Sequence, residues 1–231
     1  PDTIFAIGST TKAFTTAADD DSSDLLLTPI GSAGQTINGT AASAGVGGGS
    51  GSGQAIGTNE GIRLDFVRDV LGTPGSGGSG YQIPGNRNHT FDEHYPVNGA
   101  SVVIGDASYT TKIEFSAFDD ANGNDVVGDG ARDSVTSIAI SFGTGIEIAT
   151  VEQIGITATD ITVDGRKFKV QFVDLDPGAD VRYGVTVTGA DSSGSLSGVR
   201  FGIYTDDDYN SLEVRYVSGG TFVLGGFGTS E

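Results

Sequence analysis

Cysteine, methionine and tryptophan are all absent from this sequence of 231 residues. Without cysteine there are no disulfide bonds and no thiolate chemistry, so stability must come from elsewhere, and a bound metal ion is one such source. No run of about 18 apolar residues is present, which excludes a membrane-spanning helix. Because the sequence starts at Pro1 and has no basic-then-apolar leader, we expect it to be a fragment separated from its targeting signal.

Positive charge is also scarce, because 12 Lys and Arg residues stand against 30 Asp and Glu residues, a formal net charge of -18. Nucleic acids and anionic membranes are bound through clustered Lys and Arg. We therefore expect neither nucleic acid nor membrane insertion among the partners. An acidic chain with 38 glycines and no cysteine is typical of a bacterial secreted protein that folds outside the cell, where calcium is plentiful.

Apolar and polar residues alternate with a period of two in many short segments, which indicates half-buried strands. The clearest segments are 61–67, 109–118, 134–142, 166–173, 181–187, 199–203 and 212–216. Asp164-Gly165 favours a hairpin turn, and no segment has a sustained helical period. The sequence predicts an all-β fold, a calcium-stabilised β-sandwich with long Gly/Asp-rich loops. We expect one domain, 1–231, in which 1–60 packs on or leads into the core formed by 61–231.

Two glycine-rich tracts, 44–57 and 72–80, interrupt this pattern. Their composition is that of linkers, and a plain loop is one interpretation. Glycine also permits close approach of the backbone, so an ordered loop around an ion or ligand is the other.

The densest acidic segment lies between two predicted strands. Its candidate metal ligands are Asp119, Asp120, Asn122, Asn124, Asp125, Asp129 and Asp133. Carboxylates this close repel one another, and Ca²⁺ relieves the repulsion by binding six to eight oxygens. Asp125 and Ala131 stand where an EF-hand needs Gly and Glu, so the segment predicts an inter-strand calcium loop of another kind. The alternative is a solvated turn.

Two further acidic connections are candidate calcium sites. Their ligands would be Asp174, Asp176 and Asp180 in the first, and Asp206, Asp208 and Asn210 in the second. Exposed tight turns are the alternative for both. A cluster near the start, Asp19–Asp21 with Asp24, is better interpreted as a solvated tail.

The segment 81–95 is the candidate ligand-binding loop, because it gathers aromatic, cationic and imidazole side chains in an otherwise acidic protein. The residues concerned are Tyr81, Arg87, His89, Asp92, His94 and Tyr95. The spacing from His89 to His94 is one residue too long for an H-x-x-E-H zinc protease, and no G-x-S-x-G elbow is present. We therefore expect no enzyme activity; the alternative for the segment is a long surface excursion.

Three stretches carry a family resemblance: 61–67 after its glycine-rich lead-in, 174–180, and 204–214 with Phe222 and Phe227. They resemble β-sandwich modules in the ligand-binding region of giant bacterial repeats-in-toxin (RTX) adhesins, which type I systems secrete. The resemblance implies a calcium-dependent module on the bacterial cell surface, joined to neighbouring domains of one long chain. The tandem nonapeptide repeats of the secretion-signal region in such proteins are absent here.

From these features we expect a cell-adhesion module that uses several Ca²⁺ ions. Its ligand would be a peptide or protein C-terminus on a target cell, bound through a loop site that Ca²⁺ organises. A lectin-like module that binds sugar hydroxyls is one alternative. A structural scaffold that calcium merely stiffens is another, and a hydrolase using residues 89–94 is the last.

Overall fold

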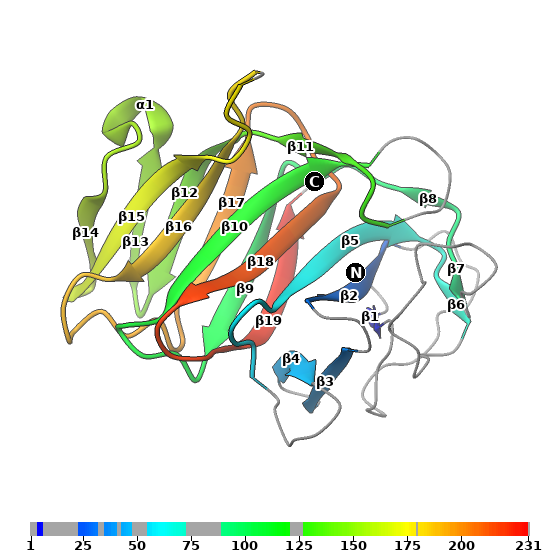
Figure 1. Ribbon diagram of the computed structural model, residues 1–231, viewed down its shortest axis with the longest axis horizontal. Helices are drawn as coiled ribbons and strands as arrows, with labels where there is room; N and C mark the ends of the chain where they lie inside the picture. Colours follow the sequence, from blue (N-terminus) through cyan, green and yellow to red (C-terminus); the bar gives the residue numbers. More distant parts are fainter. Residues whose placement is uncertain are drawn as a thin grey trace.

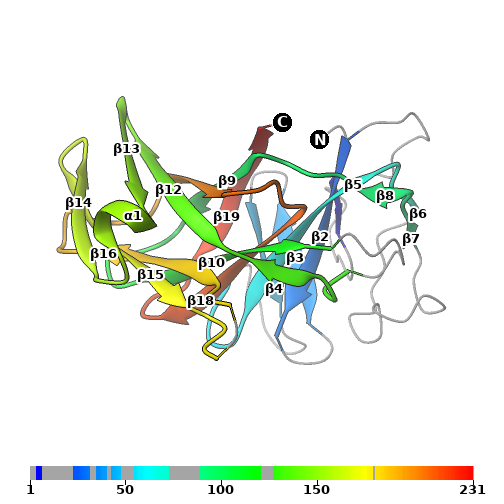
Figure 2. The ribbon, with the colours of Figure 1, turned by 90° about the horizontal axis from the view of Figure 1, so that it is seen from above.

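A computed structural model describes residues 4–6, 23–31, 35–40, 43–47, 55–72, 89–120, 127–178 and 180–230. Almost all of the regular structure is β-strand, arranged in two sheets that face each other (Figures 1 and 2). Strands pair antiparallel, except that β1 and β2 are parallel. The all-β sandwich predicted from the sequence is therefore confirmed.

The first sheet contains ten strands. Its main path runs β1 (Ile4–Ala6), β2 (Ser23–Ile30), β5 (Gly61–Arg68), β18 (Ser211–Ser218), β10 (Lys112–Asp119), β16 (Tyr183–Gly189), β15 (Arg166–Asp174) and β14 (Thr159–Val163). Two short strands join it off this path: β8 (Glu93–His94) pairs with β5, and β11 (Ala131–Asp133) pairs with β10.

The second sheet has seven strands, in the order β13 (Gly145–Thr150), β12 (Val135–Phe142), β17 (Arg200–Thr205), β9 (Gly99–Gly105), β19 (Val223–Ser230), β4 (Ser43–Gly47) and β3 (Thr36–Thr40). β6 (Leu71–Gly72) and β7 (His89–Thr90) form a separate pair. The strands between residues 23 and 47 are thus divided between the sheets: β2 belongs to the first sheet, and β3 and β4 belong to the second. The only helix among the described residues is the four-residue α1 (Val151–Ile154), which is capped by Thr150. It is too short to cross a membrane.

The core lies between the inner faces of the two sheets. Phe115 of β10 and Phe201 of β17 meet across it with ring centroids 5.4 Å apart, and both are fully buried. The predicted alternation is seen most clearly in β15, where every second side chain from Phe168 to Phe172 is buried. The predicted hairpin joins β14 to β15, and Asp164 and Gly165 both have positive φ, as a type I′ turn requires.

Strand β5 departs from simple alternation, because both of its faces are buried from Gly61 to Val67. The inner face packs into the main core. The outer face is covered by a second, smaller apolar cluster, which consists of Leu26, Val67, Val70, Phe91 and Val127. Polar residues on this outer face are therefore shielded from water, and they form the candidate site.

The contact between Phe115 and Phe201 gives a test of the sandwich. We expect Phe115→Ala to lower the free energy of unfolding by about 3–5 kcal/mol, because it opens a cavity between the sheets. Ile148→Ala is the control, because Ile148 is 59% exposed, and it should change the free energy by less than about 0.5 kcal/mol. Urea unfolding followed by circular dichroism measures both, and equal losses would contradict the assignment of the core.

Candidate metal site

Strand pairing brings three ionisable side chains together on the outer face of the first sheet. Asp65 of β5 lies opposite Ser211, the first residue of β18. Past that point β8 takes over the same edge of β5, with His94 opposite Val67. On the other side of β18, Ser211 pairs with Phe118 of β10, so the chain reaches Asp120 two residues further on. Figure 1 shows β8 and the end of β10 converging at this end of β5.

The three side chains are close enough to hold one metal ion. One potential ligand atom from each of Asp65, His94 and Asp120 lies within 4.8 Å of the other two. Asp65 and Asp120 are at most 1% exposed, and the side chain of His94 is 6% exposed. The ring of Phe91 meets the His94 ring edge-on, with centroids 5.0 Å apart, and so helps to fix its orientation. No other group of three such residues is found within the described part of the chain.

A buried arginine compensates the carboxylates. Arg63 precedes Asp65 on the same face of β5, and its Nε donates to Asp65 Oδ1 at 2.8 Å. Its Nη2 donates to Asp120 Oδ2 at 3.5 Å, and its Nη1 lies 3.7 Å from Glu213 Oε1. The guanidinium also stacks over the ring of Phe118, 5.0 Å from its centroid. Because a buried charge is costly unless it is paired, this guanidinium is what allows the acidic cluster to exist.

Each carboxylate uses one oxygen within the protein and leaves the other without a partner. Asp65 Oδ1 accepts from Arg63 and from Ser211 Oγ, the latter at 2.8 Å, and Asp120 Oδ2 accepts from Arg63. Asp65 Oδ2, Asp120 Oδ1 and His94 Nε2 are buried and have no hydrogen-bond partner among the described residues. His94 Nε2 lies 3.8 Å from Asp65 Oδ1, longer than a hydrogen bond. Buried polar atoms are usually paired, and three unpaired ones gathered in one group indicate a place where an ion could bind.

Asn210 holds the end of β10 in place. Its Oδ1 accepts the backbone N–H of Asp120 at 2.7 Å, and its Nδ2 donates to Asp119 Oδ1 at 2.9 Å. The preceding residue, Tyr209, is buried and hydrogen-bonds the second sheet, donating to Ile203 O at 2.8 Å and accepting from Ala100 N at 2.7 Å. Asn210 therefore positions Asp119 and Asp120 with both ends of its amide already occupied. Its predicted role as a metal ligand stays a prediction.

The two carboxylates have opposite pKa shifts. Burial works against ionisation of Asp65, but the Arg63 guanidinium and the nearby imidazole of His94 outweigh it and hold the pKa of Asp65 below its usual range. The pKa of Asp120 is raised to about 6, chiefly because burial disfavours the carboxylate. Asp129 adds to that effect, and the charges of His94 and Arg63 oppose it. At neutral pH both residues carry the negative charge that a metal ion requires.

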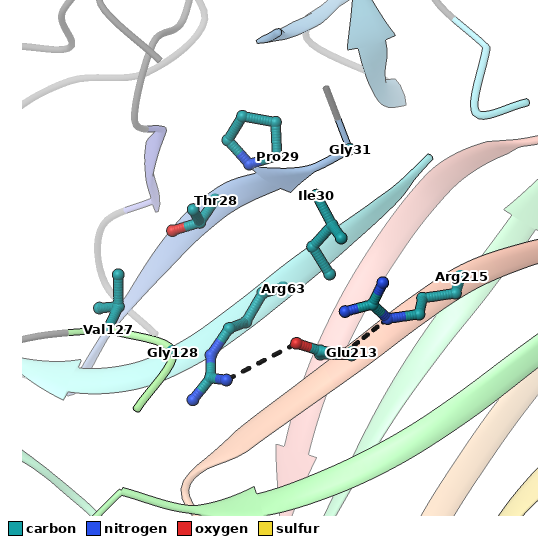
Figure 3. Close-up of a pocket in the computed structure, with 9 residues that line it drawn as sticks. All are labelled: Thr28, Pro29, Ile30, Gly31, Arg63, Val127, Gly128, Glu213 and Arg215. Atoms are coloured by element: carbon teal, nitrogen blue, oxygen red, sulfur yellow. Dashed lines mark hydrogen bonds and ion pairs between the residues drawn. The ribbon is translucent and has the colours of Figure 1, made fainter. Parts of the chain in front are cut away.

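A pocket of about 280 Å³ adjoins the cluster on the same face. It is lined by Thr28, Pro29, Ile30, Gly31, Arg63, Val127, Gly128, Glu213 and Arg215. Figure 3 shows Glu213 between the two arginines, and the Nε of Arg215 donates to it at 2.7 Å. Arg63 thus contacts the candidate metal ligands and also lines the pocket.

The remaining predicted ligands are more dispersed. The exposed ones are Asp92, Asp119, Asp129, Asp174, Asp176, Asp180, Asp206 and Asp208, and Asp133 is half-buried. Asp174 closes a local turn by accepting the backbone N–H of Asp176. Tyr95 is 3% exposed and packs against Phe66 in the core. Outside the described residues lie Tyr81, Arg87, Asn122, Asn124 and Asp125, and of His89 only the backbone, in β7, is described. All these assignments stay predictions.

Sequence reasoning placed Asp120 in a calcium loop and His94 in a ligand-binding loop, and the structure brings the two residues together. It missed Asp65, the third member of the group. The available signal was a carboxylate on the polar side of a strand rich in apolar residues, next to an arginine two positions earlier. An arginine and a carboxylate two positions apart in a strand are usually exposed. They can be recognised as buried only when the segments that cover that face of the strand are known.

Searches against protein-family models, curated proteins and solved structures gave no match for this chain.

The raised pKa of Asp120 predicts a pH-dependent cost in the metal-free protein. The pKa of Asp120 is about 6 in the folded protein and 3.8 in the reference state, so ionisation of Asp120 lowers the free energy of unfolding. The protonated side chain contributes its full stabilisation below about pH 4, and this stabilisation is lost as the pH rises through about 6. We expect Asp120→Asn to be more stable than the unsubstituted protein at pH 8, by on the order of 1 kcal/mol after allowance for solvent screening. At pH 4 the difference should vanish.

Urea unfolding in the presence of a chelator, at both pH values, measures this difference. Asp92→Asn removes one exposed negative charge and is the matched control. An Asp120→Asn variant that is less stable than the unsubstituted protein at pH 8 would contradict the prediction.

Proposed function

We propose that this protein is an extracellular, calcium-dependent adhesion module that binds the C-terminal carboxylate of a peptide or protein. The observation that carries the proposal is a pocket on one face of the sandwich, which Arg63 and Arg215 line together with Val127 and Gly128 at the end of the acidic segment. An acidic protein needs a local source of positive charge in order to attract a carboxylate. Arginine and a bound cation together supply it.

The case for Ca²⁺ rests on the carboxylates at the solvent side of the cluster. β10 and β11 pair so that Ala117 lies opposite Asp133 and Asp119 opposite Ala131, which makes Asp119 and Asp133 diagonal neighbours. Burial raises the pKa of Asp133, and the charges of Asp207 and Asp119 add to this. Carboxylates that repel one another at the surface, with room for water, suit the oxygen-rich coordination of Ca²⁺.

The case for a carboxylate ligand rests on the pocket. Arg215 is 42% exposed at its side chain, so part of its guanidinium faces solvent. Arginine binds carboxylates through paired hydrogen bonds, and this geometry favours a chain terminus over a neutral sugar. A volume of about 280 Å³ lies near the lower end for small-molecule sites and fits one or two residues of a peptide terminus. The proposed extracellular location is supported by the composition and the RTX resemblance, and the proposed attachment to neighbouring domains by that resemblance alone.

The test is an array of peptides with free C-terminal carboxylates, the same peptides as amides, and glycans. We expect free-acid peptides to bind in the presence of Ca²⁺, and binding to be lost when the C-terminus is amidated or Ca²⁺ is chelated. Arg215→Ala should weaken the best peptide by about 10- to 100-fold, since it removes hydrogen bonds between charged groups. Arg200→Ala, on the second sheet, is the matched control and should have no effect.

Other outcomes separate the alternatives. Calcium-dependent glycan binding with no preference among peptides would replace the proposal with a lectin-like function. Silence on both arrays from folded, calcium-loaded protein would leave the structural scaffold and overturn ligand binding.

A further inference from the structure

The three unpaired atoms of the cluster are best satisfied by a single cation. A proton on His94 Nε2 forms at most one hydrogen bond, and the nearest carboxylate oxygen on Asp65 is 3.8 Å away. It would leave the two free oxygens, Asp65 Oδ2 and Asp120 Oδ1, without partners. One metal ion bound by all three side chains removes all three deficits at once. Burial makes this difference large, because polar atoms that are neither solvated nor paired are most costly where water is excluded.

The chemistry of these donors distinguishes among metals. Ca²⁺ is bound almost entirely by oxygens, whereas this group presents an imidazole nitrogen beside two carboxylates in a site that is nearly closed to water. Imidazole nitrogen is a ligand typical of Zn²⁺ and of other first-row transition metals. Zn²⁺ needs only four ligands and accepts both imidazole and carboxylate. The cluster therefore suits a transition metal better than it suits calcium.

Hydrogen bonds from neighbouring residues hold the candidate ligands in place, as is usual in metal sites. Arg63 and Ser211 fix one oxygen of Asp65, Arg63 reaches the second oxygen of Asp120, and Asn210 fixes the backbone at Asp120. Contacts of this kind orient ligands towards the ion and tune its affinity. Tetrahedral Zn²⁺ with bonds of about 2.1 Å places its ligand atoms about 3.4 Å apart. The three candidate ligand atoms lie within 4.8 Å of one another, so they would move closer together when the ion binds.

We propose that Asp65, His94 and Asp120 form a binding site for a transition-metal ion of the Zn²⁺ type, separate from the surface calcium loop. Asp65 and Asp120 supply carboxylate oxygens, and His94 supplies Nε2. The ion locks the end of β10 and the short strand β8 onto β5. This site goes beyond the proposed adhesion function and does not depend on it.

Metal titration is the first test. Protein stripped with a chelator should bind one equivalent of Zn²⁺ by calorimetry, and millimolar Ca²⁺ should not displace it. At a Zn²⁺ concentration 100 times the dissociation constant, the melting temperature should rise by about 5–10 °C. Absence of Zn²⁺ binding, or displacement by Ca²⁺ at equal concentration, would overturn the proposal.

Substitutions locate the ion. We expect His94→Gln and Asp120→Asn each to weaken Zn²⁺ binding by at least roughly 100-fold, because loss of a direct ligand exceeds the 10- to 100-fold cost of losing a surrounding contact. Asp119→Asn is the matched control, since Asp119 is the exposed neighbour of Asp120 and its hydrogen bond from Asn210 can be kept by an amide oxygen. It should leave Zn²⁺ binding unchanged and reduce stabilisation by Ca²⁺. Unchanged Zn²⁺ affinity in both ligand variants would refute the site.

Nuclear magnetic resonance gives a readout that needs no ligand variant to fold. The chain has only two histidines, so the two imidazole nitrogen spectra are assigned with His89→Gln alone. Zn²⁺ should shift the Nε2 signal of His94 and leave the His89 ring unchanged. A shift confined to His89 would overturn the assignment. Because Zn²⁺ binding and peptide binding are measured separately, failure of this site and failure of the adhesion function remain distinguishable.

Discussion

The guanidinium of Arg63 is the charge on which the outer face of the first sheet depends. It lies within 3.7 Å of three carboxylates, and its side chain is only 4% exposed. Asp65 has no access to water, so without Arg63 the protein would bury this carboxylate without its main counter-charge. Removing one partner of such a pair typically costs about 3–5 kcal/mol. Loss of Arg63 would therefore destabilise the outer face of β5.

A buried ionic cluster stabilises the face of a sheet less efficiently than apolar side chains do. Apolar side chains of similar volume often give equal or greater stability, because the cost of removing charges from water cancels much of their attraction. The small apolar cluster that contains Leu26 and Phe91 shows that this face can be covered with hydrocarbon a short distance away. The unpaired atoms of Asp65, His94 and Asp120 therefore favour a role in binding over a role in stability.

The sequence specified much of the fold and only part of the site. Period-two alternation located strands such as β15, and Asp164-Gly165 located a hairpin, because both depend on neighbours in the chain. The pairing of β8 with β5 joins His94 to Val67 across 26 intervening residues, and no local pattern encodes that register. Burial of the outer face of β5 depends on segments that cover it from elsewhere. Hence Asp65 was missed, while Asp120 and His94 were found but assigned to two different loops.

Arg63 would also couple the two proposed sites electrostatically. A divalent ion held by Asp65 and Asp120 would neutralise part of the negative charge that these carboxylates now direct at the guanidinium of Arg63. More of its positive charge would then act on the adjoining pocket, where Glu213 and Arg215 complete the lining. Coupling between two binding sites is reciprocal, so an anion in the pocket would in turn strengthen binding of the ion. In a chain with net charge -18, such a local reversal of the field would favour the approach of an anionic ligand of the proposed kind to this face.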